Sequence, residues 1–130
     1  MRRKNYNEFK KKLRNIGGEQ IIIREGRCQR IKNSKGEFEY KQKGVDTYLT
    51  MDLMRLPIDY PKIKQIILIA SDSDFVPIVN DLKKRGINVI LYTYFDRKRD
   101  SMFSTSNFLL QSASRYEQLT KDDFKRCLLI

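Results

Sequence analysis

Two aspartates, Asp72 and Asp74, alternate with two serines, Ser71 and Ser73, directly after an apolar run over residues 66–70. A run that is apolar at every position is typical of a parallel strand buried on both faces. In open α/β sheets, ligands bind beyond the carboxyl ends of the strands, which is where these four residues fall. Two carboxylates this close in sequence repel bare phosphates and attract a hard divalent cation. The segment therefore indicates a cation-binding edge of a sheet.

Residues 65–92 supply the elements that must position these carboxylates. Apolar residues at helical spacing after the aspartates predict a helix, with Asp74 as its N-cap and Pro77 in its first turn. Gly86 follows three basic residues and predicts that the helix ends at about Arg85. Residues 87–92 then predict a second buried strand, which a right-handed crossover of this length can place parallel to the first.

A further helix, which carries two aspartates, is predicted upstream, from residues 43–46 to about Leu56. It carries Asp46 in its first turn and Asp52 on its apolar face. The helix dipole favours Asp46 at that place without any function. Asp52 is harder to explain, because a partly buried acid needs a partner. Residues 57–64, with two prolines, predict a connector.

The remaining segments complete an alternating pattern of helices and strands. We expect a basic amphipathic helix over residues 2–14, a strand over 20–24 and a hairpin over 27–42 that turns at 33–36. In the hairpin, basic residues accompany Phe38 and Tyr40, a combination that suits contact with a phosphate backbone and stacking of a base but is shared by polar surface hairpins. Residues 107–111 predict a short helix, 114–119 an edge strand and 121 onward a last helix.

The loop that follows residues 87–92 contains Arg97, Lys98 and Arg99. Because it leaves the carboxyl end of a predicted strand, it is a natural segment for contacting a substrate. An ordinary surface loop has the same composition, so both interpretations stay open.

Charge and histidine content limit the chemistry. Lys and Arg number 27 against 16 Asp and Glu, and the resulting charge of +11 favours a polyanionic partner, of which nucleic acid fits best. The chain has no histidine, which excludes a Ser-His-Asp triad, histidine acid–base catalysis and His-ligated zinc. If the protein cleaves nucleic acid, carboxylates and bound metal must do so.

The sequence predicts one domain over residues 1–130 that is soluble, cytoplasmic and not bound to a membrane. No apolar run is long enough to span a bilayer. Cys28 and Cys127 are too few and too far apart for a disulfide framework or a zinc site, so we interpret them as reduced thiols.

Four short segments in this order resemble the NYN domain family of PIN-like nucleases: Lys43-Gly44-Val45-Asp46, Asp52-Leu53, Ser71-Asp72-Ser73-Asp74-Phe75 and Arg85-Gly86. The resemblance implies a Rossmann-like, PIN-like α/β fold, in which a mainly parallel sheet is flanked by helices in three α/β/α layers. It also implies metal-dependent hydrolysis of RNA, with Asp46, Asp72 and Asp74 as catalytic ligands of Mg²⁺ or Mn²⁺. Substrate contacts would then come from Ser71, Ser73, Lys43, Arg97, Lys98 and Arg99.

The resemblance also predicts an incomplete N-terminus, because family members begin with a central strand that ends in Asp-Gly-x-Asn, and this sequence starts at the following helix. A missing central strand leaves sheet edges unpaired. We therefore expect self-association or a strand donated by a partner as alternatives to closure of the sheet. Two other functions stay open beside the nuclease: a catalytically degenerate module that binds RNA or regulates, and a protein-interaction domain that accepts a strand.

Overall fold

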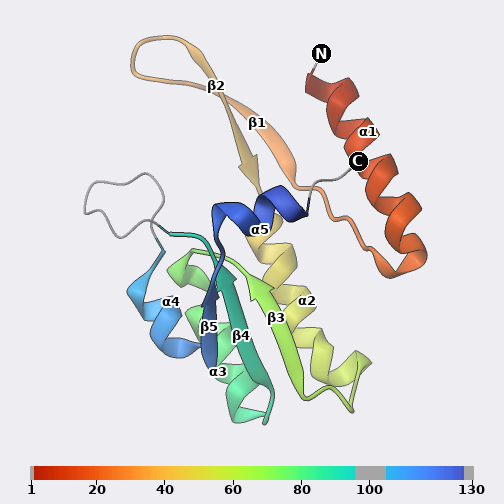
Figure 1. Ribbon diagram of the computed structural model, residues 1–130. Helices are drawn as coiled ribbons and strands as arrows, with labels where there is room; N and C mark the ends of the chain where they lie inside the picture. The colour runs from red at the N-terminus through yellow and green to blue at the C-terminus, as the bar shows by residue number, and fades with distance from the viewer. Residues whose placement is uncertain (1, 96–104, 128–130) are drawn as a thin grey trace. The chain divides into compact units, whose positions relative to one another are not determined.

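The computed structural model describes residues 2–95 and 105–127 and shows a mixed α/β protein (Figure 1). The chain divides into two compact units, the first ending at Tyr48 and the second beginning at Leu49. The prediction that residues 1–130 form a single domain stays a prediction. None of the described helices is both long enough and apolar enough to cross a membrane.

The first unit contains a helix and a hairpin. Helix α1 spans Arg2–Gly17, the short 3₁₀ helix η1 spans Gly18–Gln20, and strands β1 (Arg27–Lys32) and β2 (Phe38–Lys43) pair antiparallel. The turn between the strands is built by Asn33, whose Oδ1 accepts hydrogen bonds from the backbone N–H groups of Lys35 and Glu37, each at 2.9 Å. Gly36 supplies the positive φ of 78° that the turn requires. The predicted basic helix and hairpin are confirmed.

The strand predicted over residues 20–24 is wrong. Gln20 ends η1, and residues 21–26 pair with no strand in the described part of the chain. Three consecutive isoleucines favour the extended conformation, and Ile21 has φ −95° and ψ 110°. A strand also needs the backbone groups of a neighbour, and composition cannot tell whether a neighbour is present.

Helix α2 spans Val45–Asp59 and is longer than predicted, because it continues past Pro57. A proline removes one backbone donor, so a helix is expected to stop beside it. Here the loss falls near the end of the helix, and the next turn closes where the Tyr60 N–H donates to the Leu56 carbonyl at 2.8 Å. The connector therefore begins at Tyr60 rather than at Pro57.

The second unit holds a parallel sheet in the order β3-β4-β5, formed by β3 (Gln65–Ile69), β4 (Asn88–Thr93) and β5 (Arg115–Gln118). The 3₁₀ helix η2 (Ser73–Phe75) and helix α3 (Val76–Lys84) connect β3 to β4. Helix α4 (Asn107–Ser112) precedes β5, and α5 (Lys121–Arg126) follows it with Thr120 as N-cap. These results confirm the predicted strand–helix–strand unit, the end of α3 near Arg85 and the edge strand.

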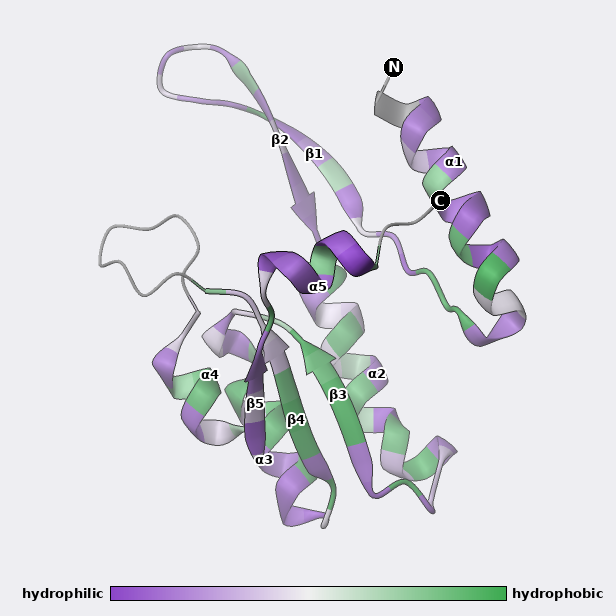
Figure 2. Cartoon of the chain, viewed as in Figure 1, coloured by the Kyte–Doolittle hydropathy of each residue, from purple (hydrophilic) through white to green (hydrophobic). Residues whose placement is uncertain are grey.

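The clustered core lies on one face of this sheet, while Ile90 of β4 is 3% exposed on the opposite face, the face that also carries Ile67. Along β3, Ile66 and Leu68 are buried together with Val79, Leu82 and Leu91. The alternate residues Ile67 and Ile69 are 57% and 70% exposed. Figure 2 shows that β3 and β4 are nevertheless hydrophobic along most of their length, while β5 is hydrophilic. The predicted burial of residues 66–70 on both faces is thus wrong for Ile67 and Ile69, and the three-layer arrangement stays a prediction.

Candidate functional site

The Asp72–Asp74 segment forms a tight turn directly after β3. Asp72 is extended, with φ −93° and ψ 136°, and its Oδ1 accepts a hydrogen bond from the Asp74 backbone N–H at 3.0 Å. Asp72 is therefore the cap, and the predicted capping role of Asp74 is wrong. The reason is that the 3₁₀ helix η2 comes before α3. The first backbone N–H groups without a helical partner therefore belong to η2, and the residue that caps them lies two positions before Asp74. Both carboxylates are exposed at the carboxyl end of β3.

Neighbouring residues fix this edge of the sheet. Phe75 is 4% exposed and packs into the core, so it anchors the turn that presents the two aspartates. The Ser106 N–H donates to the Ser71 carbonyl at 3.1 Å, which ties the loop after β3 to the start of α4. At the end of β4, the hydroxyls of Thr93 and Thr105 lie 2.7 Å apart in a hydrogen bond.

Sequence reasoning missed Thr93, Thr105 and Ser106 as residues that position this edge. Ser106 is a typical helix N-cap, and its Oγ accepts a hydrogen bond from the Leu109 N–H at 3.4 Å. That local signal was present in the sequence before α4. The contacts of Ser106 with Ser71 and of Thr105 with Thr93 join distant segments, so spacing along the chain does not reveal them.

A shallow hollow of about 300 Å³ opens where β3 and β4 end. It is lined by Ile69, Ala70, Ser71, Tyr92, Thr93 and Tyr94. Ser71 therefore lines this hollow and directly precedes Asp72 in the chain. Its exposed side chain, like that of Ser73, is available to a ligand at this edge.

The other predicted site residues lie elsewhere in the chain. Asp46 is exposed in the first turn of α2 and Lys43 is exposed at the end of β2, and both belong to the first unit. Arg97, Lys98 and Arg99 lie outside the described residues. The structure thus brings Asp72 and Asp74 together with Ser71 and Ser73, while the addition of Asp46 to the same site stays a prediction.

The donors at this edge fit a hard divalent cation. Asp72 and Asp74 offer carboxylate oxygens, and Mg²⁺ is commonly held by one or two carboxylates together with water and substrate phosphates. Within residues 2–95 and 105–127, no three Asp, Glu or Cys side chains lie close enough to hold a metal ion by themselves. Asp72 and Asp74 therefore offer at most two of the ligands that such a cation needs.

The sequence model of the NYN domain matches residues 2–119. The chain belongs to the NYN domain family. The match begins in the first unit, extends to residue 119 of the second, and includes every predicted site residue. The NYN family is generally associated with nuclease activity on RNA and is typically metal-dependent. None of the curated proteins and none of the solved structures shows a significant match to this NYN domain.

Proposed function

We propose that this NYN domain is a metal-dependent ribonuclease that hydrolyses the phosphodiester bonds of RNA. The observation that carries the proposal is the pair of exposed carboxylates, Asp72 and Asp74, at the carboxyl end of the parallel strand β3. This is the edge at which α/β sheets bind ligands. The charge of +11 and the absence of histidine agree with an acidic, metal-assisted site that acts on a polyanion.

Each residue has a role in this mechanism. Asp46, Asp72 and Asp74 would hold Mg²⁺ or Mn²⁺, which when bound activates water and stabilises the charge of the phosphorane-like transition state. The hydrogen bond from the Asp74 N–H fixes the orientation of the Asp72 carboxylate. The hydroxyls of Ser71 and Ser73 would donate to phosphate oxygens. Lys43, Arg97, Lys98 and Arg99 would hold the RNA backbone without selecting its sequence.

Cleavage of a labelled single-stranded RNA by the full chain in Mn²⁺ tests this proposal. We expect Asp72→Asn to reduce cleavage by about 100-fold or more, because one carboxylate charge is removed from the metal. Asparagine keeps a side-chain oxygen that can accept from the Asp74 N–H, so the cap is preserved. Asp122→Asn is a matched control, since Asp122 is an exposed acid that pairs only weakly with Lys125 at 3.4 Å. Cleavage that persists in EDTA or in Asp72→Asn would refute the proposal.

The second candidate is a catalytically degenerate NYN domain that binds RNA or regulates another process. The charge of +11 favours RNA binding whether or not cleavage occurs. In that case the wild-type chain binds RNA without cutting it, and Asp72→Asn leaves the affinity unchanged or raises it.

Self-association or strand donation also stays a prediction, since β3 pairs only with β4 among the described strands. Cytoplasmic location stays a prediction as well.

A further inference from the structure

The β1–β2 hairpin has two chemically different faces. Residues opposite each other in an antiparallel pair share a face, and the faces alternate along each strand. The register pairs Arg30 with Tyr40 and Lys32 with Phe38, and these residues share a face with the pair formed by Cys28 and Gln42. We call this the aromatic face: Cys28, Arg30, Lys32, Phe38, Tyr40 and Gln42. The opposite face contains Arg27, Gln29, Ile31, Glu39, Lys41 and Lys43.

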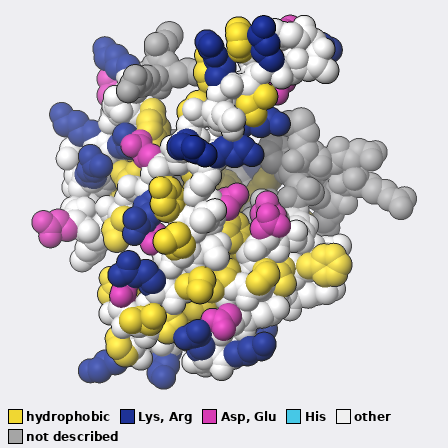
Figure 3. Space-filling view, turned by 180° about the vertical axis from the view of Figure 1, so that it is seen from behind, with side chains coloured by type: hydrophobic (Ala, Val, Ile, Leu, Met, Phe, Trp, Pro, Cys, Tyr) yellow, Lys and Arg dark blue, Asp and Glu magenta, His cyan; other side chains and the backbone are white. Residues whose placement is uncertain are grey.

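Cations and aromatic rings are in contact on the aromatic face. The Arg30 guanidinium carbon lies 4.3 Å from the centre of the Phe38 ring, and the Lys32 Nζ lies 5.4 Å from it. Both aromatic side chains are exposed, Phe38 by 53% and Tyr40 by 70%. Figure 3 shows basic and hydrophobic side chains next to one another over the hairpin. Rings that built a core would be covered, so these rings are available to a ligand with both flat apolar surfaces and negative charge.

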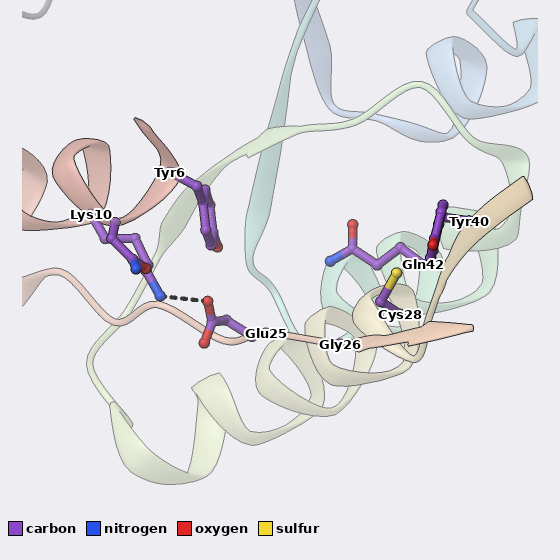
Figure 4. Close-up of a pocket in the computed structure, with 8 residues that line it drawn as sticks. Tyr6, Lys10, Glu25, Gly26, Cys28, Tyr40 and Gln42 are labelled. Carbon is purple, nitrogen blue, oxygen red and sulfur yellow. Dashed lines mark hydrogen bonds and ion pairs between the residues drawn. The ribbon is translucent and has the colours of Figure 1, made fainter. Parts of the chain in front are cut away.

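A hollow of about 700 Å³ continues this face within the first unit. Cys28, Tyr40 and Gln42 of the aromatic face line one side of it, and Tyr6, Lys10 and Glu25 line the other (Figure 4). The Tyr40 ring and the Gln42 amide offer stacking and hydrogen bonding to a nucleobase. One face of the Tyr6 ring is already in contact with Lys10, whose Nζ lies 4.7 Å from the ring centre. Lys10 donates to Glu25 at 2.7 Å, so these two opposite charges largely balance inside the hollow. The hollow therefore suits a base, while Arg30 and Lys32 outside it suit phosphates.

We propose that the aromatic face is a binding surface for single-stranded RNA. Bases stack on Tyr40 and Phe38, one base enters the hollow beside Tyr6, and Arg30 and Lys32 neutralise the phosphates between them. Base-paired RNA keeps its bases stacked inside the helix and cannot present them to these rings. The choice of RNA as ligand rests on the proposed function. The binding itself needs neither a metal ion nor cleavage.

Fluorescence anisotropy of a labelled single-stranded oligouridine with the full chain in EDTA measures this binding apart from catalysis. We expect Tyr40→Ala to weaken binding by roughly tenfold, because the loss of one aromatic ring removes the stacking of one base. Tyr40→Phe keeps the ring and should bind like the wild type. A duplex of the same length should bind less tightly than the single strand.

The charge contribution is tested with two double variants of equal charge. Arg30→Ala with Lys32→Ala removes two cations from the aromatic face, and Arg27→Ala with Lys41→Ala removes two from the opposite face of the same strands. If two phosphates are neutralised on the aromatic face, the Arg30/Lys32 variant makes the negative slope of log affinity against log salt concentration less steep by about 1.4. The Arg27/Lys41 variant leaves the slope nearly unchanged. Circular dichroism of each variant establishes that the fold is retained.

Three outcomes would overturn the inference: unchanged binding by Tyr40→Ala, equal effects of the two double variants, or preferential binding of poly-glutamate over RNA. The first two would indicate contact by diffuse charge, and the third an acidic protein partner. The result is separable from the nuclease proposal. In EDTA no metal is bound and no cleavage occurs, so lost binding in Tyr40→Ala concerns the hairpin. Lost cleavage in Asp72→Asn in Mn²⁺ concerns the proposed metal site.

Discussion

At the scale of single residues, Glu25 shows how one contact changes the acidity of a side chain. Lys10 donates to the Glu25 carboxylate at 2.7 Å, and this hydrogen bond is the main reason that the pKa of Glu25 lies below its ordinary value of 4.5, with a further hydrogen bond involving Tyr6 acting in the same direction. A carboxyl whose pKa is lowered on folding stabilises the folded state above its unfolded pKa, and that contribution is lost as the pH falls through the lower, folded pKa. The pair is thus intact at neutral pH and breaks only in acid, below 4.5.

Lys10→Met should therefore raise the pKa of Glu25 towards 4.5, because the main donor to its carboxylate is removed. An NMR titration of the side-chain carboxyl carbon of Glu25 measures the change. Lys11→Met is the matched control, since it removes an equal charge from the same helix without touching Glu25. An unchanged midpoint in Lys10→Met would show that the Lys10–Glu25 pair does not form in solution.

At the scale of elements, the predictions from the sequence were most accurate where the signals that fix a structure lie within the segment itself. The continuous apolar run, the helical spacing and Gly86 were sufficient for β3, α3 and β4, because strand length, helix period and C-terminal glycine are local signals. The strand expected over residues 20–24 failed because pairing depends on a neighbour elsewhere. The assignment of the cap to Asp74 failed because a 3₁₀ turn precedes α3, and the sequence does not distinguish that turn from a direct helix start.

Neighbouring residues of β3 give a test of how many faces of the sheet are covered. Leu68 is 4% exposed and Ile67 is 57% exposed, although both are large aliphatic residues on one strand. Leu68→Ala should lower the free energy of unfolding by about 2–5 kcal/mol, because it leaves a cavity in the core. Ile67→Ala should cost less than about 1 kcal/mol, because its side chain loses little packing. Urea unfolding of both variants measures the difference. Equal costs would show that a layer covers Ile67, as the three-layer prediction requires.

At the scale of the whole molecule, the buried residues are distributed unevenly. Every side chain that is buried in the described residues lies between Leu53 and Ala113, in the second unit. The described part of the first unit has only exposed and half-buried side chains, and α1 and the hairpin are rich in charge. Apolar burial is the main favourable contribution to folding, so the second unit carries most of the stability, and the first supplies charged and aromatic surface.

A fragment of residues 45–130, which keeps α2 whole, should therefore fold by itself. We expect it to unfold cooperatively in urea, with a free energy of unfolding within about 2 kcal/mol of that of the full chain, because it retains every buried side chain of the described core and exceeds the size at which domains become marginal. The complementary fragment of residues 1–44 should be largely unfolded by circular dichroism, since a lone helix and a two-stranded hairpin are marginal in water. If residues 45–130 failed to fold while the full chain folds, the first unit would have to complete the core, and the single domain predicted from the sequence would be the correct description.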